Sequence, residues 1–308
     1  MITCVAPSPS IDRLFEVERL QPGEIHRPTQ FVQVAGGKGL NAARAAAALG
    51  AEVHAVALLG GQSGRWIADE LGRLGLPFVA ASCEGETRSC LSVADEESAS
   101  LTEFYEENAA VSSREWEAFV RAAQDAAVSS AWTTISGSLP PGAPADGYEE
   151  LIATGVNVAV DTTALGAAQP GLVKVNAAEA ATLTGLAVDS VDEAVEAAQA
   201  LRRRIGGEGR AAAVTCGRDG AVLAVPGGSA WHGSLAAAGR YPVGSGDAFL
   251  AGLVTAVAAG ADWPDALAAA LGAAAANAEL PGAGLLHATR ARELAAQAVV
   301  ESAATAAR

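Results

Sequence analysis

Short apolar runs alternate along most of the chain with alanine-rich stretches that have helical spacing. Alanine has the highest intrinsic helix propensity and lets helices pack close to a sheet, so these stretches predict helices. The predicted helices cover residues 40–49, 116–128, 191–204, 248–259 and 265–278. The β-branched runs between them predict strands at residues 53–59, 132–136, 156–160, 172–175, 212–215 and 221–224. This alternation indicates a mainly parallel sheet with right-handed crossovers.

Two stretches depart from this pattern. Residues 11–35 and 90–110 contain alternating apolar and polar positions, which predict extended strands outside the parallel sheet. Such strands would form a small β-layer beside the α/β core and could cover a ligand at the ends of the parallel strands. The final stretch, residues 290–308, is rich in alanine and polar residues and predicts a last helix.

The composition argues against several classes of protein. The 308 residues include 20 Lys and Arg against 35 Asp and Glu, and the formal charge of −15 argues against nucleic-acid binding, which needs a basic face. The four cysteines show no CxxC spacing and the four histidines show no HxH or HxxxH spacing, so neither a disulfide framework nor a zinc site is expected. The start lacks the basic residues of a signal peptide, and the longest apolar run, residues 248–261, is too short to span a bilayer. We therefore expect a cytoplasmic protein without a membrane or nucleic-acid partner.

A first glycine-rich stretch, residues 35–41, lies between a predicted strand and a predicted helix. Glycines at such a turn allow positive φ angles and a close approach of a ligand, and the N–H groups at a helix start attract anions. Two other interpretations stay open. The glycines could simply allow close helix packing, and Gly37, Gly39 and Ala42 also fit the GxGxxA fingerprint of a nicotinamide-dependent dehydrogenase.

A second stretch, residues 242–252, opens an alanine-rich helix with Gly244, Ser245, Gly246 and Asp247. Ser or Asp at this place could cap the helix, which stabilises it by about 1 kcal/mol. Capping needs only one such residue, however, and the two glycines would cost stability without another purpose. The N–H groups of a Gly-Ser-Gly turn form an anion-binding concavity, and a neighbouring carboxylate can take a proton from a hydroxyl. This combination is the minimum that phosphoryl transfer to an alcohol requires.

In this order, the two glycine-rich stretches resemble the two signatures of the ribokinase-like PfkB family of carbohydrate kinases. Further segments resemble motifs of that family, namely residues 7–13 (PSPSIDR), 136–142 (SGSLPPG), 174–179 (KVNAAE) and 215–221 (TCGRDGA). The PVGSGD and SGSLPPG forms are most similar to the sugar-phosphate branch, which contains 1-phosphofructokinase, tagatose-6-phosphate kinase and 6-phosphofructokinase of the second type. The resemblance implies a single α/β domain over residues 1–308, with a three-layer α/β/α core of about nine strands. Residues 11–35 and 90–110 would then form its small β-sheet lid.

The resemblance also implies roles for individual residues. Asp247 would be the catalytic base that activates the sugar hydroxyl. The anion hole for the transferring phosphoryl group would come from Gly244, Ser245 and Gly246. The sugar would be bound by Asp12, Gly37, Lys38, Asn41 and Ser138. A magnesium–phosphate assembly would be held, through water, by Asn176 and Glu179. The nucleotide would also contact Thr215, Gly217, Gly220 and Asn277.

The charge of the substrate depends on the lid. A sugar phosphate needs a cation for its distal phosphate, and Arg88 matches the arginine that sugar-phosphate members carry there. Arg27 is a second candidate. The segments that depart from the family pattern are Tyr241-Pro242 in place of Asn-Pro or Asn-Thr, Lys174-Val175-Asn176 in place of KPN, and residues 106–110 in place of a Gly-Pro turn. The last of these lies in an acidic stretch with Glu103, Glu106 and Glu107.

The sequence thus predicts a kinase that uses ATP and Mg²⁺ and acts on fructose 1-phosphate, fructose 6-phosphate or tagatose 6-phosphate. The alternatives are a kinase of an unphosphorylated sugar or nucleoside, a non-catalytic sugar-binding protein, and the dehydrogenase. Lids of this family close over the sugar and often pair between subunits, which is compatible with a homodimer. The sequence leaves open whether a monovalent cation takes part.

Overall fold

The computed structural model describes residues 1–155, 157–237 and 239–303 and contains a large and a small β-sheet. Ten strands form the large sheet in the order β14-β13-β12-β11-β10-β9-β8-β1-β4-β5. Their bounds are β1 (Ile2–Ala6), β4 (Val53–Gly60), β5 (Phe78–Cys83), β8 (Trp132–Ser136), β9 (Val158–Asp161), β10 (Leu172–Asn176), β11 (Ala211–Thr215), β12 (Ala221–Ala224), β13 (Ala230–Ser234) and β14 (Val299–Ala303). Within this sheet, the neighbouring strands β5, β4, β1, β8, β9, β10 and β11 run parallel to one another. The strands β12, β13 and β14 add an antiparallel edge next to β11. The predicted mainly parallel sheet is confirmed.

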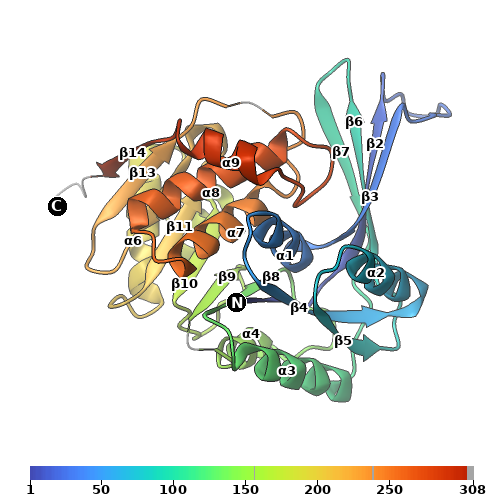
Figure 1. Ribbon diagram of the computed structural model, residues 1–308, viewed down its shortest axis with the longest axis horizontal. Coiled ribbons are helices and arrows are strands. Elements are labelled where there is room, and N and C mark those ends of the chain that lie inside the picture. Colours follow the sequence, from blue (N-terminus) through green and yellow to red (C-terminus); the bar gives the residue numbers. More distant parts are fainter. Residues whose placement is uncertain (156, 238, 304–308) are drawn as a thin grey trace.

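Helices cover both faces of this sheet (Figure 1). One face packs against α1 (Lys38–Ala48), α2 (Gly61–Arg73), α7 (Ser245–Ala258), α8 (Trp263–Ala278) and α9 (Ala288–Ala295). The other face packs against α3 (Ser113–Ala127), α4 (Gly147–Ile152), α5 (Ala177–Thr184) and α6 (Val191–Arg204). The structure therefore has the expected three layers. Among the described residues, no helix is both long and apolar enough to cross a membrane.

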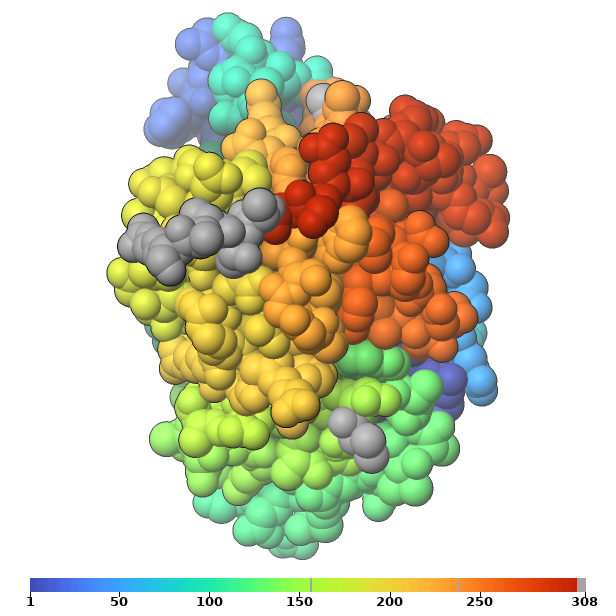
Figure 2. Space-filling model, turned by 90° about the vertical axis from the view of Figure 1, so that its left-hand side faces the viewer, coloured from blue at the N-terminus to red at the C-terminus, as the bar shows by residue number. Residues whose placement is uncertain are grey.

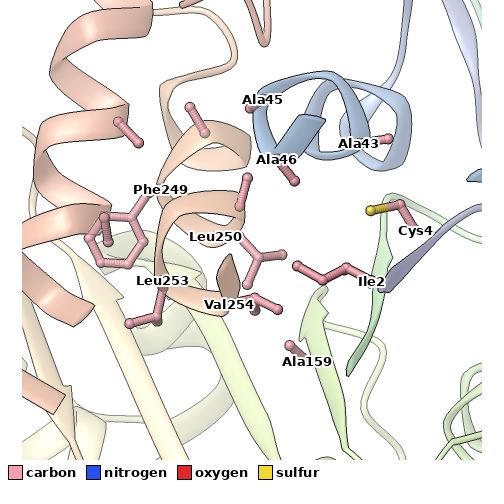
Figure 3. Close-up of a cluster of buried hydrophobic side chains, with 14 of the residues drawn as sticks. Ile2, Cys4, Ala43, Ala45, Ala46, Ala159, Phe249, Leu250, Leu253 and Val254 are labelled. Carbon is pink, nitrogen blue, oxygen red and sulfur yellow. The ribbon is translucent and has the colours of Figure 1, made fainter. Parts of the chain in front are cut away.

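Small side chains let α1 and α7 lie close to the centre of the sheet. Leu250 and Val254 of α7 point toward Ile2 of β1, beside Ala46 of α1 (Figure 3). All four side chains are at most 3 % exposed. Alanine leaves room for these larger neighbours, so the alanine-rich pattern that predicted the helices also brings their N-termini to the edge of the sheet.

A separate four-stranded sheet projects from the body beside α2 (Figure 1), and its strands rise at the top of the view in Figure 2. We call it the lid sheet, and it contains β3 (Gln30–Gly36), β2 (Ser10–Val17), β6 (Ser89–Asp95) and β7 (Ser100–Tyr105) in that order. Residues 11–35 and 90–110 therefore supply strands outside the parallel sheet, as predicted. β2 follows closely after β1 and β3 runs directly into α1, so both ends of this hairpin are fixed to the core.

The predicted final helix over residues 290–308 is wrong. α9 ends at Ala295, and Val299–Ala303 forms β14, which pairs antiparallel with β13. The β-branched pair at the start of β14 suits an edge strand, and pairing with β13 satisfies its backbone. Residues 304–308, and residue 156 of another predicted strand, lie outside the described residues. The helix α2 was not predicted, because Gly61, Gly64 and Gly72 interrupt its helical pattern.

The contact between α7 and α8 gives a test of this packing. A Cβ atom at Gly252 would lie 2.9 Å from the Cβ of Ala273 and 3.0 Å from the carbonyl oxygen of Ala269. We expect Gly252→Ala to lower the free energy of unfolding by about 1–3 kcal/mol, the usual cost of overpacking, in a urea titration. The control is Gly72→Ala in α2, where a Cβ would meet no atom within 4 Å. Alanine there should raise the free energy of unfolding by up to about 1 kcal/mol, and equal effects of the two substitutions would contradict the packing.

Candidate active site

A cleft of about 770 Å³ lies between the lid sheet and the carboxyl ends of β9, β10 and β11. This edge of a parallel sheet is where ligands bind in open α/β folds. Residues far apart in the sequence meet there. The predicted site residues that line the cleft are Asp12, Gly37, Lys38, Asn41, Arg88, Ser138, Asn176, Glu179, Thr215, Gly217, Gly244, Gly246 and Asp247.

Four predicted site residues do not line the cleft: Ser245, Gly220, Asn277 and Arg27. Gly220 ends a 3-10 turn with φ +88°, and a Cβ there would meet the backbone of Gly233, so its role in the structure is a tight turn. Arg27 is exposed in the loop between β2 and β3. Asn277 is fully buried, and its amide is hydrogen-bonded within the core.

Asn277 instead supports the turn before α7. Its Nδ2 donates to the carbonyl oxygen of Val243 at 2.9 Å and to the Oγ of Ser245 at 3.2 Å. Its Oδ1 accepts from the N–H of Gly284 at 2.7 Å. The buried amide of Asn277 therefore fixes both ends of the glycine turn. Asn277 thus affects the cleft indirectly, through the position of this turn.

Both glycine-rich stretches form the N-termini of long helices at the cleft. Gly37 precedes α1 with φ +86°, and a Cβ there would lie 2.6 Å from the carbonyl oxygen of Ser8. Gly244 precedes α7 with φ +81°, and a Cβ there would lie 2.7 Å from Ala283. Among the described residues, neither helix has a side-chain cap, so the interpretation of Ser245 or Asp247 as an N-cap is wrong. The N–H of Ser245 donates to the carbonyl oxygen of Pro242 at 3.1 Å. The N–H groups that follow in the first turn of such a helix can bind an anion.

The dehydrogenase alternative fails on the position of the first stretch. The strand before Gly37 is β3, which belongs to the lid sheet and not to the parallel sheet. A dinucleotide fingerprint follows the first strand of a parallel βαβ unit. The GxGxxA match is therefore a coincidence of spacing.

Asp247 is a buried carboxylate in the first turn of α7, with a side-chain hydrogen bond to α1. Its Oδ2 accepts from the Nδ2 of Asn41 at 2.9 Å. Burial, and next the negative charge of Asp161, raise the pKa of Asp247 to about 7, although Lys174 and Lys38 act in the opposite direction. A carboxylate with this pKa can both accept and release a proton near neutral pH.

Asp161, at the carboxyl end of β9, holds two lysines at the floor of the cleft. Its Oδ1 lies 2.9 Å from the Nζ of Lys38, and its Oδ2 lies 2.7 Å from the Nζ of Lys174. Burial raises the pKa of Asp161, but the ammonium groups of Lys174 and Lys38 outweigh it and hold that pKa below its ordinary value. The Nζ of Lys174 also lies 2.7 Å from the position that a Cβ on Gly246 would take. Two cations thus lie beside the glycine turn of α7.

Sequence reasoning did not identify Asp161 as a site residue. The only signal was its position directly after a predicted strand, where a side chain reaches the ligand edge of a parallel sheet. From the sequence, Lys174 is recognisable only as part of a segment similar to the KPN motif. The structure shows that both belong to one buried ion-pair group.

Asn176 and Glu179 form a capping box at the start of α5. The Oδ1 of Asn176 accepts from the N–H of Glu179 at 2.8 Å, and the Oε2 of Glu179 accepts from the N–H of Asn176 at 2.9 Å. The Oε1 of Glu179 lies 3.5 Å from the Nζ of Lys38. Among the described residues there is no cluster of three or more His, Cys, Asp or Glu side chains able to hold a metal directly. The oxygen donors of Asn176 and Glu179 are of the type that holds Mg²⁺, commonly through its water shell.

Arg88 lines the cleft from the lid side. Its Nη1 donates to the carbonyl oxygen of Glu106 at 3.3 Å, while its Nε is buried without a hydrogen-bond partner among the described residues. The carboxylate of Glu106 accepts from the N–H of Ser89 at 2.7 Å and does not line the cleft. Glu103 does line it, where its Oε1 accepts from the hydroxyl of Tyr105 at 2.6 Å. On the lid side, the cleft is therefore lined by the guanidinium of Arg88 and by two carboxylates, Asp12 and Glu103.

Asn108, in the segment that departs from the family pattern, contacts two serines of the cleft. Its Oδ1 accepts from the Oγ of Ser8 at 2.8 Å, and its Nδ2 donates to the Oγ of Ser138 at 3.3 Å. Ser8 and Ser138 both line the cleft. The altered end of the lid thus orients hydroxyl groups of the core.

Comparisons with known proteins agree with this site. Residues 2–290 match the family described as pfkB family carbohydrate kinase. A 1-phosphofructokinase from Haloferax volcanii is 32 % identical over 262 residues, which cover 82 % of this chain and 83 % of that protein. Phosphofructokinase-2 from Escherichia coli, solved in complex with potassium, superposes with a TM-score of 0.86 at 25 % identity, over 96 % of this chain and 98 % of that one.

A possible 1-phosphofructokinase from Thermotoga maritima has the same fold, with a TM-score of 0.85 at 23 % identity over 99 % of this chain and all of the other. The ribokinase of Arabidopsis thaliana also matches in fold, with a TM-score of 0.70 at 21 % identity over 96 % of this chain and 98 % of the other. The fold is therefore ribokinase-like, as the sequence motifs implied. The family match over residues 2–290 and the 1-phosphofructokinase relative show that this protein belongs to the pfkB family of carbohydrate kinases and is a phosphotransferase that acts on a sugar hydroxyl.

Proposed function

We propose that the chain transfers the γ-phosphoryl group of ATP to a hydroxyl of a phosphorylated ketohexose. The candidate acceptors are fructose 1-phosphate, fructose 6-phosphate and tagatose 6-phosphate. The observation that carries the proposal is Asp247, a buried carboxylate with a raised pKa directly beside the glycine turn of α7. The curated relative is a 1-phosphofructokinase, which supports a phosphorylated fructose as the acceptor.

Asp247 would act as the base. Its pKa of about 7 makes it a proton acceptor near neutral pH, and the sugar hydroxyl would lose its proton to this carboxylate as it attacks phosphorus. The hydrogen bond from Asn41 fixes the position of the carboxylate. Asn41 and Asp247 come from the first turns of α1 and α7, so the close packing of these helices sets the direction of attack.

Negative charge on the transferring group would be met by groups that already point into the cleft. Gly244 and Gly246 line the cleft at the start of α7, and the Nζ of Lys174 lies beside Gly246. Lys38 extends from the start of α1 with a side chain that is 41 % exposed. Such preorganised donors stabilise developing charge without having to reorganise during the reaction.

Mg²⁺ belongs to the proposal through Asn176 and Glu179, which would hold it by way of its water ligands. When bound, the ion supplies neutralising charge to the β- and γ-phosphate oxygens. The Escherichia coli neighbour was solved with potassium. Turnover with and without KCl tests whether this chain also uses a monovalent cation.

Changing Asp247 tests the base. We expect Asp247→Asn to lower kcat by about a hundredfold to ten-thousandfold in a coupled ADP-release assay with MgATP and each candidate sugar phosphate. In the unchanged enzyme, kcat/KM should rise with pH up to about 7 and then level off, because the base must be ionised.

Unfolding of the same variant is the control for its fold. Because the folded pKa of Asp247 lies above its unfolded value, deprotonation destabilises the folded state progressively from about pH 4 to pH 7. Asp247→Asn removes this charge and should be at least as stable as the unchanged chain at pH 8. Full activity of that variant would refute the assignment of the base.

Changing Arg88 tests whether the acceptor sugar carries a phosphate. We expect Arg88→Ala to raise the KM for the sugar phosphate by about tenfold or more, since a charge-assisted hydrogen bond is lost, and to leave the KM for ATP unchanged. Arg121→Ala, on the exposed face of α3, is the matched control. If turnover instead occurs only with an unphosphorylated sugar or a nucleoside, and Arg88→Ala leaves it unaffected, the acceptor carries no phosphate. The carboxylate of Glu103 in the cleft would favour such a neutral acceptor.

A homodimer through the lid sheet is also part of the proposal. Phe31 pairs with Phe15, and Phe104 pairs with Leu91, on the face of the lid sheet opposite to Asp12. Phe31 and Phe104 are 56 % and 58 % exposed, and a second copy of this sheet would cover them. We expect sedimentation velocity to show a dimer that Phe104→Glu converts to a monomer. Val128→Glu, at a more exposed apolar position at the end of α3, should leave the dimer intact. A monomeric unchanged chain would contradict this part.

A further inference from the structure

Besides Asp12, the lid strand β2 contains a second carboxylate, Glu16, and the proposed chemistry does not use it. Glu16 is 5 % exposed, although it lies in a sheet that projects from the body. Its Oε1 lies 2.6 Å from the Nη2 of Arg240 and accepts from the hydroxyl of Tyr241 at 3.1 Å. A buried carboxylate needs such partners, because an unpaired one is costly.

The partners of Glu16 belong to the core. The N–H of Tyr241 donates to the carbonyl oxygen of Ala278 at 2.9 Å, so the segment is fixed to the end of α8. The same segment runs through Pro242 and Val243 into the glycine turn of α7. Tyr241 is one of the positions at which this chain departs from its family.

Glu16 also lies on the same side of β2 as Asp12, the residue proposed to bind the sugar. Asp12 and Glu16 are four positions apart, so both face the core side of the strand. Asp12 lines the cleft, and Glu16 lies beyond it toward the tip of the lid sheet. One strand thus carries a sugar contact at one position and a bond to the core at the other.

Apolar packing between these two positions is incomplete. A small cavity of about 30 Å³ lies between the lid sheet and the core, lined by Leu14, Val34, Leu101, Tyr241 and Val243 among others. Contacts across a gap of this kind are weakened. The polar contacts of Glu16 therefore contribute more to holding the lid sheet than their number suggests.

Arg240 contacts both lid carboxylates nearby. Its Nη2 lies 3.2 Å from the Oε1 of Glu96, at the end of β6, in addition to its contact with Glu16. Its guanidinium also lies 5.7 Å from the ring centre of Tyr241. Arg240 is half exposed, so its ion pairs alone hold the lid weakly. The hydroxyl of Tyr241 supplies the additional partner of the buried Glu16 carboxylate.

We propose that Glu16, Glu96, Arg240 and Tyr241, here called the Glu16 cluster, hold the lid sheet over the cleft before the sugar binds, and that Glu16 is a positioning residue for the sugar. Without the cluster, the lid sheet would leave this position for part of the time. The apparent sugar affinity would then equal the intrinsic affinity multiplied by the fraction of molecules that have the lid in place. A saturating sugar would restore the lid, so kcat would be nearly unchanged. The proposal rests on the proposed contact of Asp12 with the sugar.

The test uses Tyr241→Phe and Glu16→Gln in the full chain, with MgATP and the sugar phosphate that the unchanged enzyme turns over. Tyr241→Phe removes one hydroxyl and keeps the ring, and Glu16→Gln removes the charge and keeps an acceptor. We expect each variant to raise the KM for the sugar about threefold to tenfold, with kcat and the KM for ATP within about twofold. The double variant should show less than the product of the two effects, because both act on one contact.

Two further measurements separate this role from a merely structural one. Without sugar, amide hydrogen exchange in β2 and β3 should become faster in both variants, and added sugar phosphate should restore protection. The control is Arg19→Gln, which breaks the exposed pair with Glu97 on the same sheet and should change neither KM nor exchange. A lower kcat at unchanged KM, or no change in any parameter, would refute the positioning role. No turnover of the unchanged enzyme with any sugar phosphate would refute the proposed function instead.

Discussion

The site depends on the unequal distribution of two lysines between two buried carboxylates. Asp161 receives both ammonium groups, from Lys38 at 2.9 Å and Lys174 at 2.7 Å. Among the described residues, the side chain that donates a hydrogen bond to Asp247 is the neutral amide of Asn41. Two neighbouring carboxylates in a dry site cannot both ionise at low cost unless cations compensate them. Here the compensation goes mainly to Asp161, which stays charged, and burial together with that negative charge raises the pKa of Asp247 to about 7.

Glycine and alanine bring these charges together. Gly37 and Gly244 allow α1 and α7 to start against the backbone of the core, where a Cβ atom would lie within 2.7 Å of its neighbours. Alanine-rich faces then let both helices lie against β1. The interpretation of the glycines as packing residues and their interpretation as an anion site are therefore not alternatives. The same lack of side chains serves both, because a helix start can meet a phosphate only if it lies at the edge of the sheet.

Much of this arrangement could be predicted from the sequence, because it depends on local patterns. The spacing of apolar positions and the composition predicted the parallel sheet and the separate lid strands. The ordered motifs predicted most of the residues that line the cleft. Residues whose role depends on tertiary contacts could not be found in this way. Asp161 became significant only when β9 placed it between two lysines, and Asn277 turned inward to hold the turn of α7. The edge strand β14 was missed because its pairing with β13 outweighs the helix propensity of its surroundings.

Two of the positions that depart from the family pattern have structural partners between the lid and the core. Tyr241 contacts Glu16 of the lid sheet, and Asn108 contacts Ser8 and Ser138 of the core. The electrostatic balance between Asp247 and Asp161 depends on the contacts of Lys38, Lys174 and Asn41. Contacts that set where the lid sheet lies, and which hydroxyls it orients, can change without disturbing that balance. Substitutions at these two contacts would therefore act on the position of the lid sheet and on the hydroxyls of Ser8 and Ser138, rather than on the ion pairs of Asp161.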